Sequence, residues 1–162
     1  MSKNDYASED AREMAKILRT AKCIRRYDKI SHDLLGEILV AAALEGVVEG
    51  GNRRGSDIHA PAFGLVEVKS RILGTDGPFP RVSLRPSNIE KADYFVAIRW
   101  NRDFSFYDAV MNSKEAVLPL YSVKKQGSGV AHISWKDWCS TSGAVSLKER
   151  MIQILHGNEE VR

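Results

Sequence analysis

The sequence predicts an α/β fold in which a mixed central β-sheet is flanked by helices. Two segments near the N-terminus and one near the C-terminus carry apolar residues at helical spacing. Between residues 47 and 110, apolar and polar residues alternate in several short stretches, as they do in β-strands. Helices before and after a block of strands indicate helices packed against a sheet.

The first helix is expected over residues 9–26. Met14, Leu18 and other apolar residues form a single stripe along it. Ser8 precedes the stripe and is a suitable N-cap. The stripe predicts that one face of this helix packs against the core.

The second helix is expected over residues 32–44, where apolar residues surround almost the whole helix and predict burial on most faces. Glu37 lies inside this run. A carboxylate there needs a partner, because burying an unpaired charge is costly. Glu37 therefore either binds a metal or a polar group inside the protein, or it points out at the helix edge or caps an amide. Both alternatives stay open.

The remaining elements are shorter. Alternating or strongly apolar stretches predict strands at residues 47–49, 56–60, 65–70, 81–85, 94–98 and 104–110. Residues 86–93 are expected to form a short helical turn, and residues 114–121 a helix that Pro119 limits. A C-terminal helix is expected over residues 146–155. This order places all strands of the sheet between the N-terminal and C-terminal helices.

The composition is that of a single globular domain. The chain has 162 residues, of which 43% are apolar and 28% charged. No run of apolar residues is long enough to span a membrane, and the polar N-terminus is unlike a signal peptide. Cys23 and Cys139 lie far apart and form no zinc motif. We therefore expect a cytoplasmic protein with reduced thiols.

Positive charge gathers in the middle of the chain. The net charge is only +3, which permits a nucleic-acid partner without indicating one. Nine basic residues lie between positions 53 and 102, against five acidic ones. Besides Lys91, the basic residues are Arg53, Arg54, Lys69, Arg71, Arg81, Arg85, Arg99 and Arg102. Such a segment is suited to phosphate contacts, and a solvated surface is the alternative.

Two carboxylates and an ammonium group are predicted to converge on one patch of the sheet. Glu67 and Lys69 are two residues apart in one predicted strand, so their side chains point to the same face. Asp57 lies on the preceding strand, and a hairpin would bring it alongside Glu67. The alternative is that Glu67 and Lys69 form a surface ion pair, which would contribute little.

This set of residues suits the hydrolysis of a phosphodiester bond. Mg²⁺ prefers hard oxygen ligands and keeps several waters, so two carboxylates can hold it against a phosphate. A bound metal makes water more acidic and shields the charge that develops on the phosphate. Lys69 is placed to bind the attacking water or a phosphate oxygen, and Mn²⁺ is expected to substitute for Mg²⁺. His59 shares the predicted strand face of Asp57, either as a further ligand or in a structural role.

The segment Gly55-Ser56-Asp57, followed by Val66-Glu67-Val68-Lys69-Ser70, resembles the PD-(D/E)xK nuclease superfamily. Its spacing is similar to that of the short type II restriction endonucleases, and the resemblance covers about residues 31–110. Ser56 stands where the name-giving motif has proline. The resemblance implies a restriction-endonuclease-like core, with Asp57, Glu67 and the Val68 carbonyl as metal ligands and Lys69 assisting the nucleophilic water. It also implies a role for Glu37, which varies in the family.

The same resemblance suggests where DNA would bind. In the related enzymes a segment after the lysine strand often enters a groove. Here that segment carries basic and hydroxyl side chains that suit base edges or phosphates, namely Arg71, Arg81, Ser83 and Arg85. Arg53 and Arg54, in a glycine-rich loop, suit the DNA backbone.

Three functions remain open from the sequence. The first is a sequence-specific DNA endonuclease that acts as a homodimer, because one active site per chain requires two copies to cut both strands of a palindrome. The second is a structure-specific or DNA-repair nuclease with the same chemistry. The third is a non-catalytic DNA-binding protein on this fold, since the fold alone does not determine function.

Overall fold

The computed structural model describes residues 6–20, 32–49, 56–74 and 79–157. Its centre is a six-stranded sheet with strand order β1-β2-β3-β5-β6-β8. The strands are β1 (Val47–Val48), β2 (Ile58–Ala60), β3 (Gly64–Ile72), β5 (Tyr94–Trp100), β6 (Phe106–Ser113) and β8 (Val145–Ser146). Strands β3 and β5 are parallel, and the other described neighbours in this sheet are antiparallel. The prediction of an α/β fold with a mixed central sheet is therefore confirmed.

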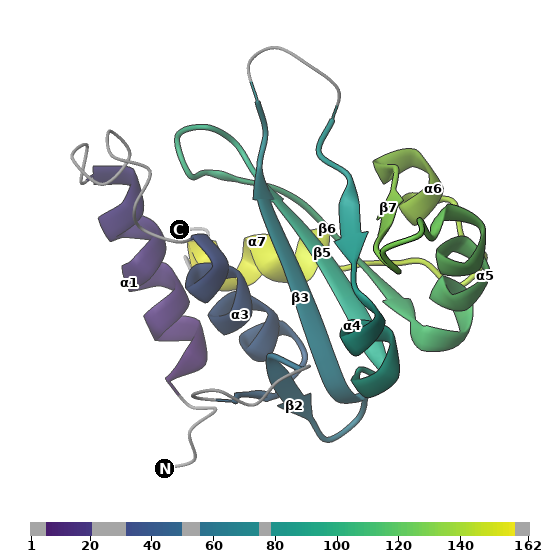
Figure 1. The fold of residues 1–162 in the computed structure, drawn as a ribbon. Coiled ribbons are helices and arrows are strands. Elements are labelled where there is room, and N and C mark those ends of the chain that lie inside the picture. The colour runs from purple at the N-terminus through teal and green to yellow at the C-terminus, as the bar shows by residue number, and fades with distance from the viewer. Residues whose placement is uncertain (1–5, 21–31, 50–55, 75–78, 158–162) are drawn as a thin grey trace.

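Helices cover one face of this sheet. They are α1 (Ala7–Thr20), α3 (His32–Ala43) and α7 (Lys148–His156). Helices α1 and α3 lie side by side, and α3 packs on β3 (Figure 1). Their apolar faces meet the inward side chains of the strands, for example Leu35, Val96 and Met151, in one buried cluster. This layer holds the larger part of the hydrophobic core.

A smaller layer covers the other face. It contains a two-stranded sheet of β4 (Val82–Leu84) and β7 (Ala131–Ile133), with helices α4 (Pro86–Lys91), α5 (Lys114–Lys124) and α6 (Trp135–Cys139). Figure 1 shows α5, α6 and β7 at the end of the molecule away from α1. Phe95, Ala97 and Trp138 belong to a second buried cluster on this side.

The two N-terminal helices follow their predicted periodicity. Helix α1 runs to Thr20, and the predicted continuation to residue 26 lies outside the described residues. Helix α3 lies very close to the sheet because Gly36 has no side chain. A Cβ at Gly36 would lie 3.2 Å from the Ser70 Oγ and 3.3 Å from an Ile98 methyl group. This close approach places the next residue, Glu37, near the strands.

Several predicted boundaries differ from the structure: β2 begins at Ile58 rather than at residue 56, for example, and the differences at α5 and β6 are larger. Helix α5 continues past Pro119 to Lys124, although proline costs a helix one hydrogen bond. Val117 and Tyr121 are buried on its inner face, and the Tyr121 hydroxyl donates to the Gly129 carbonyl at 2.5 Å. Packing of this face offsets the lost bond. Strand β6 begins at Phe106 rather than at residue 104 and extends to Ser113.

Candidate active site

Glu67 and Lys69 share one face of β3, as their spacing predicted. The Lys69 Nζ donates to the Glu67 Oε1 at 2.6 Å. The Glu67 side chain is 8% exposed and that of Lys69 is 23% exposed. The pair is therefore not a solvated surface ladder. Its neighbours Val66, Val68 and Ser70 point to the opposite face and are buried towards α3.

Asp57 reaches the same strand by a hydrogen bond to the backbone. It lies immediately before β2, and the last paired residues of β2 and β3 are Ile58 and Val66. Beyond that pair the Val68 N–H has no β2 residue opposite it, and the Asp57 Oδ2 accepts from it at 2.7 Å. The N–H and C=O of one strand residue point to the same side, so the Val68 carbonyl also faces the Asp57 side. The predicted hairpin therefore brings Asp57 beside the Glu67–Lys69 pair.

Glu37 belongs to this group of acids. Burial, and then the charges of Asp57, Asp33 and Glu67, raise the pKa of Glu37 to about 7. Burial, and then the charge of Glu67, raise the pKa of Asp57 to about 6, although the Val68 N–H and Lys69 act in the opposite direction. Three carboxylates therefore repel one another at the edge of β3. A cation at this position would relieve the repulsion.

The donor set fits a hard cation that keeps much of its water. Within the described ranges no three His, Cys, Asp or Glu side chains are arranged to hold a metal by themselves. Asp57 and Glu67 supply two carboxylates, and the Val68 carbonyl supplies a third oxygen. Mg²⁺ is commonly bound by one or two carboxylates, with waters and phosphate oxygens completing its shell. The residues present therefore suit Mg²⁺ better than a metal that needs a full protein cage.

Asn88 is a site residue that the sequence analysis missed. It lies in α4, its side chain is buried, and its Nδ2 donates to the Glu67 Oε1 at 2.8 Å. Its Oδ1 accepts from the backbone N–H of Arg85 at 2.9 Å. An asparagine in the first turn of a short helix ordinarily indicates only a cap, so the sequence carries no signal of the second contact.

Arg99 is buried and does not belong to the phosphate-contacting surface expected for the basic segment. Its guanidinium donates to the carbonyls of Lys69, Pro80 and Ile98 at 3.1, 3.2 and 2.9 Å. It also lies 4.8 Å from the ring centre of Trp135. Burial, and then the charge of Arg71, lower the pKa of Arg99 to about 10, so the group stays charged at neutral pH. Through its hydrogen bond to the Lys69 carbonyl, Arg99 holds the backbone of Lys69 in place.

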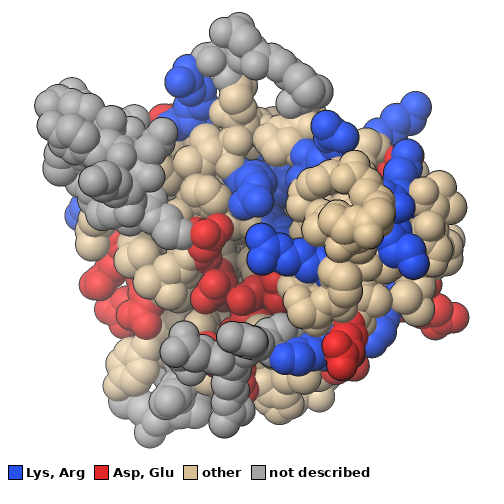
Figure 2. All heavy atoms as spheres, viewed as in Figure 1, with Lys and Arg blue, Asp and Glu red and all other residues tan. Residues whose placement is uncertain are grey.

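The described residues expected to contact DNA lie on β3 and in the segment that contains β4. Arg71, Arg81 and Arg85 are exposed, whereas Val82 and Leu84, between Arg81 and Arg85, are buried. Arg81, Ser83 and Arg85 thus alternate with buried residues, as predicted, although β4 itself spans only Val82–Leu84. Figure 2 shows acidic side chains gathered on this face of the molecule with basic side chains next to them. Arg53 and Arg54 lie outside the described residues.

His132 is a second residue whose place the sequence did not reveal. It lies opposite Ser83 in the β4–β7 pair, and its Nδ1 is 2.7 Å from the Ser83 Oγ. The outer face of this two-stranded sheet therefore presents His132 together with Ser83. His59, which shares the expected strand with Asp57, has an exposed side chain on β2.

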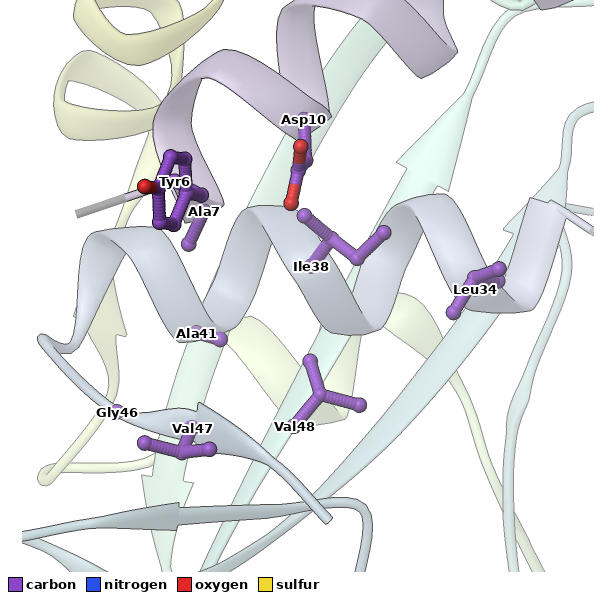
Figure 3. Close-up of a pocket in the computed structure, with 9 residues that line it drawn as sticks. All are labelled: Tyr6, Ala7, Asp10, Leu34, Ile38, Ala41, Gly46, Val47 and Val48. Carbon is purple, nitrogen blue, oxygen red and sulfur yellow. The ribbon is translucent and has the colours of Figure 1, made fainter. Parts of the chain in front are cut away.

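A separate apolar hollow lies between α1, α3 and β1 (Figure 3). It has a volume of about 470 Å³, and Leu34, Ile38 and Val48 are among its lining residues. Asp57, Glu67 and Lys69 do not line it. The hollow is therefore distinct from the acidic site.

The sequence matches no protein-family model, and no curated protein matches it significantly. Among the described helices, none has the length and apolar character needed to cross a membrane.

Proposed function

We propose that the protein is a Mg²⁺-dependent DNA endonuclease of the PD-(D/E)xK type, acting as a sequence-specific restriction endonuclease. One observation carries the proposal. The Asp57 carboxylate bonds to the Val68 N–H, and Val68 lies between Glu67 and Lys69 on β3. Two carboxylates, a carbonyl and an ammonium group thus meet at residues 67–69 of β3 and at Asp57, which bonds to the middle one of the three.

Each group has a role in phosphodiester hydrolysis. Asp57, Glu67 and the Val68 carbonyl would hold Mg²⁺. Bound Mg²⁺ supplies a more acidic water and a positive charge beside the phosphate. Lys69 would hold the attacking water or a phosphate oxygen with the ammonium group that now bonds to Glu67. Glu37, with a pKa raised to about 7, can release or accept a proton near neutral pH at the edge of the site.

Basic side chains next to the acids on this face of the molecule support DNA as the substrate (Figure 2). Arg71 on β3, and Arg81 and Arg85 on either side of β4, are exposed. Exposed arginines contact phosphates and bind guanine edges in the major groove, which is wide enough for a two-stranded β-ribbon. The β4–β7 pair, with Ser83 and His132 outward, is such a ribbon. We propose that it reads duplex DNA, with Arg53 and Arg54 as additional backbone contacts.

A homodimer follows from the proposed chemistry. The described residues carry one such site per chain, and a sequence-specific cut through both strands needs two. A two-fold dimer presents two identical sites to the two strands of a palindrome.

The test is incubation of the purified protein with supercoiled plasmid DNA in Mg²⁺. The proposal predicts discrete fragments and no cleavage after Asp57→Ala or Glu67→Ala. Asp93→Ala is a matched control, since the Asp93 Oδ2 also accepts a β3 backbone N–H, that of Leu65 at 2.9 Å. It should cleave as the wild type does. Cleavage only of branched or damaged DNA would instead indicate a repair nuclease, and DNA binding without cleavage a non-catalytic protein.

A further inference from the structure

The Glu67 carboxylate is held through one of its two oxygens. Lys69 Nζ and Asn88 Nδ2 both donate to Oε1, at 2.6 and 2.8 Å. The terminal torsion of a glutamate is otherwise broad, so these donors determine which way Oε2 points. An oriented Oε2 is what a metal ligand requires.

Of the two donors, Asn88 is the one suited to holding Glu67 during a reaction. Lys69 has a long, flexible side chain that is 23% exposed, and in the proposed function it must turn to water or phosphate. The Asn88 residue is 7% exposed and uses both ends of its amide. Because Oδ1 accepts from the Arg85 N–H, the Nδ2 group must face Glu67.

The Asn88 contact also connects two parts of the proposed site. Arg85 follows β4 directly and precedes α4, so the backbone N–H from which Asn88 accepts lies next to the strand proposed to contact DNA. Its other end holds the proposed metal ligand in β3. A shift of β4 would therefore move the Asn88 amide that donates to Glu67.

We infer that Asn88 is a positioning residue that orients Glu67 for metal binding from the junction of β4 and α4. The inference rests on the proposed function, and Asn88 acts only through Glu67. Hydrogen-bond partners of metal ligands commonly contribute about 10- to 100-fold to metal affinity or activity.

The first test measures Mn²⁺ binding by titration calorimetry. Asn88→Ala should weaken Mn²⁺ binding at least tenfold. Asn112→Ala is the matched control: Asn112 is also a buried asparagine, lies in β6 and donates to the Trp138 carbonyl at 2.9 Å, away from Glu67. It should lower the Tm without changing Mn²⁺ affinity. Equal Mn²⁺ affinity in the Asn88→Ala variant and the wild type would overturn the inference.

The second test separates positioning from helix capping. Asn88→Asp keeps an oxygen for the Arg85 N–H but puts a carboxylate in place of the N–H groups that reach Glu67. Cleavage of plasmid DNA at saturating Mg²⁺ should fall at least tenfold, and an unchanged rate would show that Asn88 only caps α4. Wild-type Mn²⁺ binding that Glu67→Ala does not weaken would instead refute the proposed function itself.

Discussion

The carboxylate of Asp57 accepts a hydrogen bond from the backbone N–H of Val68 at 2.7 Å. Strand β2 ends its pairing with β3 just before this point, so the carboxylate takes the position of a missing strand partner. The bond brings a negative charge next to Glu67, and burial together with that charge raises the pKa of Asp57 to about 6. The site is therefore built at a cost in stability that a cation would offset.

Asp57→Asn should stabilise the metal-free protein. The amide oxygen can still accept from the Val68 N–H, while the charge that Glu67 and Glu37 repel is removed. We expect the unfolding free energy to rise by about 1 kcal/mol, which corresponds to an increase in Tm of roughly 2–4 °C. Thermal unfolding in EDTA measures this.

The matched control is Asp93→Asn, which also keeps an acceptor for a β3 N–H, that of Leu65. Asp93 is not among the carboxylates whose charge raises the pKa of Asp57. This variant should not be stabilised. A lower Tm for Asp57→Asn than for the wild type would contradict the electrostatic account of the site.

Metal-free stability should depend on pH through the same groups. The pKa values of Glu37 and Asp57 are raised to about 7 and about 6, so the folded state favours their protonated forms. Their contribution to the free energy of unfolding is fully present below their ordinary pKa values, about 4. It is lost as the pH rises through about 6 and 7. Above about pH 7, a bound divalent cation should make this loss of stability smaller.

The pH effect is isolated by comparing the wild type with a Glu37→Gln/Asp57→Asn double variant. Subtraction removes the opposing contribution of His32, whose pKa burial lowers. The difference in Tm between the two proteins should grow from about pH 5 to about pH 8. A constant difference would show that these carboxylates do not titrate as proposed.

Arg81 and Arg85 should differ from each other in DNA binding if one reads a base. Loss of a bidentate guanine contact costs about 1–3 kcal/mol and relaxes preference at one position of the site. Loss of a phosphate contact weakens binding to all sequences and lowers the salt dependence by about one unit of slope. Binding isotherms of Arg81→Ala and Arg85→Ala at several salt concentrations distinguish these results.

His132→Ala tests whether the two-stranded sheet is the reading element. The His132 Nδ1 lies 2.7 Å from the Ser83 Oγ, so its removal frees the Ser83 hydroxyl. Sequence preference should change while affinity for nonspecific DNA stays close to that of the wild type. Unchanged preference in both His132→Ala and Ser83→Ala would remove this face from the interface.

The parts of the site that follow a local period were predictable. Glu67 and Lys69 are two residues apart in a strand, and Asp57 precedes them across a short turn, so alternation and a hairpin suffice to bring them together. The same alternation predicted that Arg81, Ser83 and Arg85 share one face, and the residues between them, Val82 and Leu84, are buried. Strands β3 and β5 were recognised because their patterns are long enough to be distinct.

The parts that depend on long-range packing were not predictable. Asn88 reaches Glu67 across 21 positions, and His132 reaches Ser83 across 49, and neither contact leaves a spacing in the sequence. Strand β5 continues past its apolar stretch through Arg99, whose buried charge is stabilised by hydrogen bonds to carbonyl groups and by the ring of Trp135. Strands β7 and β8 have three and two residues, which is too short to show a period.

The most direct test of the catalytic account is Lys69→Ala, measured by single-turnover cleavage in Mg²⁺ beside DNA binding in Ca²⁺. Lys69 lies on β3 next to Glu67, where it would hold the attacking water, so its loss should slow cleavage about 10²- to 10⁴-fold. Binding should fall far less, because one of many phosphate contacts is lost. Lys69→Arg should not restore the rate fully, since the planar guanidinium does not replace a compact ammonium group. Equal losses of binding and cleavage, or a wild-type protein that binds DNA and never cuts it, would contradict the account.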